Sequence, residues 1–183
     1  MSKEIKILGF TGSLRQNSFN KAALRAAQEL VPDGASLEIF DLAPIPFFNE
    51  DVEAQGFPPA VAEFRSAIAT ADALLLVTPE YNYSIAPVLK NALDWASRGK
   101  DSPLPGKPAA VMSASTGMLG GARAQYHLRQ VGVILNLQLL NRPEVFIASA
   151  AAKFDQEGRL TDEPTREVIR KLLSALVEYA RKA

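Results

Sequence analysis

Two kinds of apolar segment alternate along the chain. Short, continuous apolar runs are typical of strands buried on both faces of a parallel sheet, and they are separated by longer segments with apolar residues at helical spacing. The runs predicted as strands are Ile5–Phe10, Leu37–Phe40, Ala73–Thr78, Pro108–Ser113 and Leu135–Leu140, the last either ending there or continuing to Phe146–Ala148.

Helices are predicted in the segments between these strands and after the last one. Their ranges are Phe19–Leu30, Pro59–Ala71, Pro87–Ser97, Ala122–Val131 and Glu163–Arg181. Such alternation indicates a parallel sheet with helices on both faces, because each right-handed crossover needs a helix. Five strands in 183 residues fit the flavodoxin-like order 2-1-3-4-5 better than a six-stranded dinucleotide-binding domain. We therefore predict one domain over residues 1–183, a three-layer α/β/α sandwich.

Composition and charge narrow the class of partner. Apolar residues make up 48% of the chain, and 20 basic side chains balance 20 acidic ones, so no global field would attract nucleic acid or anionic lipid. The amino-terminal segment Met1–Glu4 is short and charged, unlike a signal peptide, and no apolar run approaches the length of a membrane span. We expect a cytoplasmic protein that binds neither nucleic acid nor membrane.

The chain contains no cysteine and a single histidine, His127. Disulfides, thiolate nucleophiles, iron–sulfur clusters and thiolate zinc sites are therefore excluded, and a histidine-based metal site would lack a second imidazole. We expect no metal, and any redox chemistry would need an organic cofactor.

The loop after the first predicted strand is rich in hydrogen-bonding groups. Gly12–Asn20 contains Ser13, Arg15, Ser18 and Asn20 and leads directly into a helix. Unpaired amides and the helix dipole favour a phosphate at such a helix start. There is neither a Gly-x-Gly-x-x-Gly fingerprint nor a Walker loop. The alternative is simple capping of the helix by Ser18.

Two further loops follow neighbouring strands. Thr78–Ser84 holds Tyr81 and Tyr83 around an asparagine, an arrangement that suits a flat heteroaromatic ring or, alternatively, a subunit interface. Ser113–Gly121 ends in a run with three glycines, which permit close approach of a ligand or merely close helix–strand packing. Because ligands of open parallel sheets bind at the carboxyl ends of the strands, the three loops predict one shared site.

Several other residues are assigned ordinary structural roles. We expect surface or interface packing for His127, core packing for Trp95, and an ordinary loop position for Asp41, although dinucleotide-binding folds place a ribose carboxylate there. Arg123 and Glu144 are expected to form a solvated ion pair or to meet across a subunit contact.

Taken together, these motifs resemble the NADPH-dependent FMN reductase family. The resemblance rests on Gly12–Arg15 with Ser18–Asn20, on Thr78–Ser84 with Leu89–Trp95, and on Gly120–Arg129, which is similar to the chromate-reductase and quinone-reductase branch. It covers nearly the whole chain and is weakest after Ala150. Gln16-Asn17 departs from relatives that carry a basic residue followed by glycine.

The resemblance implies a site for non-covalent FMN and a nicotinamide donor, NADPH or NADH. In it, Ser13, Arg15, Ser18, Phe19 and Asn20 would surround the FMN phosphate. The ring would lie against Pro79, Glu80, Tyr81, Asn82 and Tyr83, and Ser115 and Gly117 would contact the ring edge or ribityl chain. The resemblance also implies a homodimer or homotetramer.

The predicted reaction is hydride transfer from NAD(P)H to the flavin and then to a small acceptor such as a quinone, chromate or an azo compound. No catalytic side chain is nominated, since the flavin carries the chemistry. The alternative is a non-enzymatic flavodoxin-like electron carrier or binding scaffold. A phosphotransfer receiver is disfavoured because Thr11-Gly12 and Thr78-Pro79 stand where that fold needs aspartates.

Overall fold

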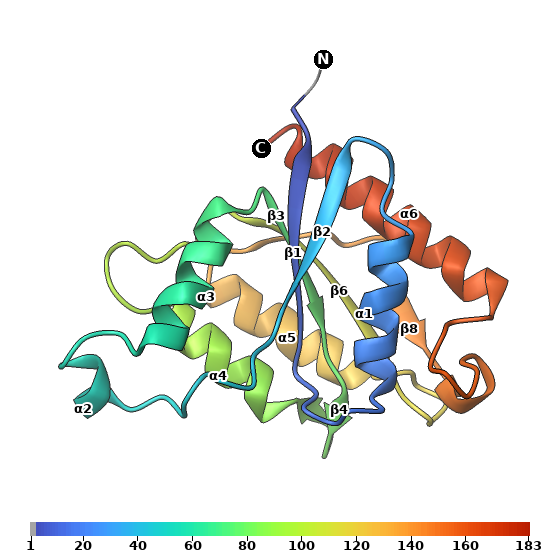
Figure 1. Ribbon diagram of the computed structural model, residues 1–183, viewed down its shortest axis with the longest axis horizontal. Helices are drawn as coiled ribbons and strands as arrows, with labels where there is room; N and C mark the ends of the chain where they lie inside the picture. The colour runs from blue at the N-terminus through green and yellow to red at the C-terminus, as the bar shows by residue number, and fades with distance from the viewer. Residues whose placement is uncertain (1–2) are drawn as a thin grey trace.

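A computed structural model describes residues 3–183, which form a twisted parallel sheet between two layers of helices (Figure 1). Met1 and Ser2, the start of the predicted non-signal segment, lie outside the described residues. The main-sheet strands are β1 (Ile5–Thr11), β2 (Ala35–Phe40), β3 (Ala73–Val77), β6 (Pro108–Ala114), β7 (Gln138–Leu139) and β8 (Val145–Ile147). The helices are α1 (Phe19–Glu29), α2 (Glu50–Glu53), α3 (Pro59–Thr70), α4 (Pro87–Ala96), α5 (Ala122–Ile134) and α6 (Glu163–Ala180).

The order of strands confirms the predicted topology. The sheet runs β2-β1-β3-β6-β7, with β8 also paired to β6, and every pairing is parallel. All five residues of the central strand β3 are buried, as its continuous apolar run predicts. Helices α1 and α6 pack on one face of the sheet, and α3, α4 and α5 pack on the other, so each face has its own apolar core.

The predicted last strand is divided in two. Its first residue, Leu135, caps α5, and β7 pairs only Gln138 and Leu139 with the start of β6. After Pro143 the chain pairs again along the same edge, where β8 aligns with the last three residues of β6. A proline lacks the N–H that a continuous ladder needs, so the segment 135–148 cannot run as one strand.

A small hairpin, absent from the predicted elements, follows β3. Strands β4 (Glu80–Tyr81) and β5 (Ser84–Ile85) pair antiparallel around Asn82 and Tyr83, whose φ angles are 47° and 68°. Two left-handed residues between paired strands make the turn type that matches strand twist. The hairpin projects from the carboxyl edge of the sheet, at the bottom of Figure 1. Within residues 3–183, no helix is long and apolar enough to cross a membrane.

Candidate functional site

A hollow of about 270 Å³ opens at the carboxyl edge of the sheet, between the three loops singled out in the sequence. It lies where the loops after β1, β3 and β6 meet. Nine predicted site residues line it: Ser13, Arg15, Ser18, Phe19, Asn20, Pro79, Glu80, Tyr81 and Ser115. Ala114 and Thr116 also line it and were not predicted, because nothing in their residue type indicates a ligand.

The first loop presents unused backbone donors beside a helix start. Within residues 3–183, the N–H groups of residues 14–17 have no hydrogen-bond acceptor, and these four residues are exposed. They precede α1, an 11-residue helix whose amino-terminal dipole favours an anion. The loop turns at Gly12, where a Cβ atom would stand 2.7 Å from the Ala86 side chain and 2.9 Å from that of Leu89. Glycine therefore allows the loop to lie directly on the start of α4.

Arg15 supplies positive charge at this loop. Its guanidinium donates to the Asn17 carbonyl over 3.0 Å, and among the described residues it forms no ion pair. Ser13 is 2% exposed on the wall of the hollow. Arg15, Ser13 and Ser18 thus line one space, and the unused amides belong to the same loop, so the loop supplies the kinds of donor that a phosphate group requires.

The predicted capping role of Ser18 is confirmed. Its hydroxyl oxygen accepts from the amides of Asn20 and Lys21 at the start of α1, while its own O–H proton remains available to donate. Phe19 packs against Phe154 with 5.3 Å between ring centroids, so its ring is part of the core beneath the loop.

Asn20 has a role that the sequence did not predict. Its side-chain amide donates to the Ala114 carbonyl and its side-chain oxygen accepts from the Ala114 amide, both over 2.9 Å. Asn20 is 3% exposed. Through this pair of hydrogen bonds Asn20 ties the first loop to the end of β6, where the third loop begins, and it also lines the hollow.

The second loop is held by an ion pair that crosses to α5. Glu80 pairs with Arg123 and also accepts from the Ala124 amide over 3.4 Å, so its carboxylate lies at the start of α5. The Arg123 guanidinium stacks over the Tyr83 ring, 3.6 Å from its centroid. The hydrogen bond with Glu80 raises the pKa of Arg123, which stays charged.

This arrangement corrects the expected Arg123–Glu144 pair, since Arg123 pairs within the chain with Glu80. Glu144 instead accepts from the Tyr126 hydroxyl over 3.4 Å. The sequence did not indicate this pair because Glu80, in β4, and Arg123, in α5, are 43 residues apart.

Three predicted site residues do not line the hollow. Asn82 and Tyr83 form the tip of the β4–β5 hairpin, and Tyr83 is 66% exposed. The Gly117 amide donates to the Ser115 hydroxyl over 3.1 Å and its carbonyl accepts from the Ser149 amide over 3.2 Å. Gly117 thereby shapes the third loop, which brings Ser115 to the hollow.

The residues assigned structural roles occupy such positions. Trp95 is fully buried and donates to the Pro46 carbonyl over 2.9 Å. His127 lies on the exposed side of α5, with Nδ1 3.1 Å from the Ser84 hydroxyl. This contact adds a further link between α5 and the hairpin.

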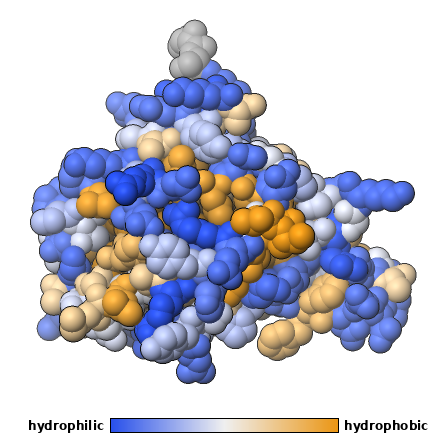
Figure 2. Space-filling view, turned by 180° about the vertical axis from the view of Figure 1, so that it is seen from behind, coloured by the Kyte–Doolittle hydropathy of each residue, from blue (hydrophilic) through white to orange (hydrophobic). Residues whose placement is uncertain are grey.

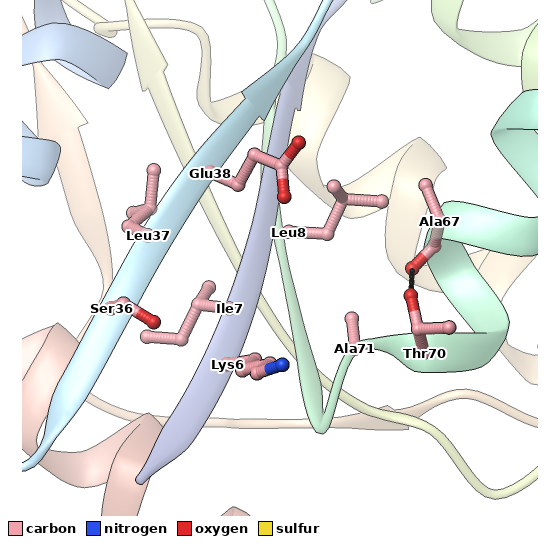
Figure 3. A pocket seen from close by; sticks show the side chains of 9 residues that line it. All are labelled: Lys6, Ile7, Leu8, Ser36, Leu37, Glu38, Ala67, Thr70 and Ala71. Carbon is pink, nitrogen blue, oxygen red and sulfur yellow. Dashed lines mark hydrogen bonds between the residues drawn. The ribbon is translucent and has the colours of Figure 1, made fainter.

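A different hollow, of about 310 Å³, lies between β1, β2 and the end of α3 (Figure 3). Leu8, Glu38 and Thr70 are among its lining residues, and the only hydrogen bond among the residues drawn joins Thr70 to the Ala67 carbonyl within α3. It lies along the strands, and none of its lining residues belongs to the three loops at the carboxyl edge.

A comparison with known families matches residues 5–152 to NADPH-dependent FMN reductases. The chain belongs to this family. The match spans the three loops and the hairpin, and it confirms the predicted family and, with it, the predicted class of activity: an oxidoreductase that uses FMN with a nicotinamide donor.

Two curated relatives and one solved structure are similar to this chain along nearly its full length. An NAD(P)H-dependent FMN reductase of Pseudomonas aeruginosa is 57% identical over 182 residues, covering 100% of this chain and 98% of that protein. A quinone reductase of Escherichia coli is 40% identical over 187 residues, with coverage of 100% and 98%. The flavoenzyme NAD(P)H:acceptor oxidoreductase FerB of Paracoccus denitrificans superposes with a TM-score of 0.88 at 31% identity, covering 97% of this chain and 98% of FerB. The flavodoxin-like fold is confirmed.

Proposed function

We propose that the hollow between the three loops binds FMN non-covalently and that the protein reduces quinones and similar small acceptors with electrons from NAD(P)H. The observation that carries the proposal is the loop before α1, where the amides of residues 14–17 have no acceptor and Arg15 forms no ion pair within residues 3–183. The residues present fit a phosphate ester there, since the first loop offers donors and positive charge, and the Glu80 carboxylate, which also lines the hollow, is paired with Arg123.

Each loop has a separate part in holding the cofactor. Ser13, Arg15, the amides of residues 14–17 and the Ser18 hydroxyl would hold the phosphate. Pro79 and Tyr81 would lie along the ring, and Ser115 would contact its edge or the ribityl chain. Phe19, Asn20, Glu80 and Gly117 would position these groups, and Asn82 and Tyr83 would form the rim.

Hydride acceptance from NAD(P)H and hydride donation to a second substrate, in two half-reactions, are the chemistry that bound FMN supplies. The chain contributes position and access. Tyr81, which lines the hollow, is 46% exposed, and Leu14, between the lining residues Ser13 and Arg15 in the chain, is 51% exposed, so this loop region offers apolar surface to a flat acceptor such as a quinone. Quinones are the acceptors named for the plant and Escherichia coli relatives. Chromate and azo compounds stay proposals of the same class, because they too need only access to the ring.

A non-enzymatic electron carrier is the second candidate. The neutral net charge does not favour it, because a carrier that docks on other proteins relies on a strongly charged face. Rapid oxidation of NADPH by the FMN-loaded protein in the presence of a quinone would support the enzyme. Failure of every small acceptor tested to support NADPH oxidation would support the carrier.

We further propose that the protein forms a homodimer or homotetramer. The helix α5 lies behind the sheet in Figure 1 and faces the viewer in Figure 2, where apolar patches interrupt the polar surface. Tyr126, Val133 and Ile134 of α5 are 51%, 80% and 84% exposed. Large apolar side chains exposed on one helix are typical of a surface covered by another copy.

The phosphate assignment is tested by Arg15→Ala. Loss of one charge-assisted contact of about 1.5–3 kcal/mol would weaken FMN binding roughly 10- to 150-fold in a fluorescence titration. Arg181→Ala is the matched control, because Arg181 approaches Gly34, before the start of β2 at the opposite edge of the sheet. Equal FMN affinity in the Arg15 variant and the wild type would refute the assignment.

A further inference from the structure

Another hollow, of about 330 Å³, lies between α1 and β2 on the far side of the first loop. Thr11, the last residue of β1, lines it, and Ser13, two residues later, lines the proposed FMN site. Figure 1 shows α1 alongside β2, with the carboxyl end of β2 at the same edge of the sheet as the hairpin. The two hollows therefore open at one edge, on either side of the same loop.

The floor of this hollow is apolar. Leu24 and Leu42 are 1% and 2% exposed, whereas Ile39 keeps 37% of its surface exposed. An apolar floor with one accessible aliphatic side chain suits a flat ring system, since a ring laid on it removes that surface from water.

The rim carries charges of both signs. Lys21 and Arg25 are one turn apart on α1 and thus on the same side of the helix, and within residues 3–183 neither forms an ion pair. The Lys21 ammonium donates to the Leu14 carbonyl over 3.3 Å, which places it between the two hollows. Across from α1, Asp41 follows β2, and one of its carboxylate oxygens accepts from the Ala43 amide over 3.0 Å while the other has no partner in this part of the chain.

An apolar floor, a carboxylate acceptor and two cations match the three parts of a nucleotide. The base would cover Ile39, the ribose hydroxyls would donate to Asp41, and phosphate groups would approach Lys21 and Arg25. A carboxylate after the second strand binds ribose hydroxyls in dinucleotide folds. Here the cations of α1 would bind the phosphate groups, which a glycine-rich turn binds in those folds.

We propose that this hollow binds the adenine-nucleotide half of NAD(P)H while the nicotinamide lies at the FMN site. The proposal rests on the proposed function and adds to it the residues that recognise the donor. It makes Arg25, Lys21 and Asp41 determinants of donor affinity with no direct part in binding FMN or the acceptor.

The test compares two donors on the FMN-loaded protein. NADPH carries the adenine nucleotide, and reduced nicotinamide mononucleotide lacks it. Arg25→Glu should raise the KM for NADPH about tenfold or more, because it replaces a cation that lines the hollow with a carboxylate that repels phosphate, and should leave kcat/KM for the mononucleotide unchanged. Arg181→Glu, the same change at the opposite edge, should alter neither donor. An unchanged KM for NADPH, or equal losses with both donors, would overturn the proposal.

A direct titration separates this proposal from the proposed function. ADP should bind the FMN-loaded wild type by calorimetry and bind Arg25→Glu at least tenfold more weakly. If the protein retained no FMN, the proposed function would fail, yet the dependence of ADP binding on Arg25 would still decide the assignment of this hollow. Equal ADP affinity of the two proteins, or no binding at millimolar ADP, would overturn it.

Discussion

Asn20 offers the sharpest separation between a ligand-binding residue and a positioning residue. Its amide makes two 2.9 Å hydrogen bonds to the backbone of Ala114, and it is 3% exposed. Asn20→Ala leaves a buried N–H and a buried C=O without these partners. Each such bond contributes about 0.5–1.5 kcal/mol net, and each buried group left unpaired costs about 1–3 kcal/mol. With two groups left unpaired, we expect the free energy of unfolding to fall by about 2–6 kcal/mol, the lower end applying if water enters the space and bonds them.

The assay is urea unfolding of the FMN-free protein, so that cofactor binding does not contribute. Asn17→Ala is the matched control, because Asn17 is exposed in the same loop and its side chain forms no hydrogen bond within residues 3–183. That change should alter the free energy of unfolding by no more than about 0.5 kcal/mol.

A different outcome would return Asn20 to the phosphate site. Suppose that Asn20→Ala unfolded at the wild-type urea concentration yet bound FMN at least tenfold more weakly. The Asn20 amide would then be a ligand for the cofactor, and its hydrogen bonds to Ala114 would not stabilise the fold.

Two further predictions concern stability. Burial raises the pKa of Asp72, but hydrogen bonds from the Lys3 side chain and a backbone amide lower it more, so the net shift is downward. Its stabilising effect is therefore present above the ordinary pKa of about 3.9 and is lost as the pH falls through the lower folded-state pKa. Asp72→Asn should cost about 1 kcal/mol at pH 7 in urea unfolding, with the difference narrowing below about pH 4; a constant difference down to pH 2 would contradict this. Gly121 has φ of +87°, and a Cβ there would stand 2.7 Å from the Ser113 Cβ atom. Gly121→Ala should lower the free energy of unfolding by about 2–3 kcal/mol, whereas Gly117→Ala, with its nearest neighbour at 3.6 Å, should change it little; equal effects would refute the packing argument.

The parallel sheet could be predicted from sequence because periodicity reports burial. The run Ala73–Thr78 is apolar at consecutive positions, which only a strand covered on both faces requires, and β3 occupies Ala73–Val77. The boundary of the last predicted strand was uncertain because apolar runs lie on both sides of the polar segment 141–144, which contains Pro143, and periodicity does not register a missing N–H.

The sequence predicted where the candidate site lies in the fold better than it predicted which contacts each of its residues makes. The positions of strand ends bring Ser13, Tyr81 and Ser115 to one hollow, as the topology requires. The functions of Asn20 and Glu80 depend on partners that are 94 and 43 residues away, Ala114 and Arg123. Residue type alone cannot say whether a buried polar side chain faces a ligand or completes the hydrogen bonding of another loop.

The central claim, that FMN bound between the three loops takes electrons from a nicotinamide donor, is tested by the absorption spectrum of the purified protein. The protein would be mixed with FMN, desalted, and then given NADPH in the absence of oxygen. We predict a two-band flavin spectrum that survives desalting and bleaches with NADPH. A protein that retains no flavin after saturation with FMN, or retained flavin that NADPH leaves oxidised, would contradict the claim.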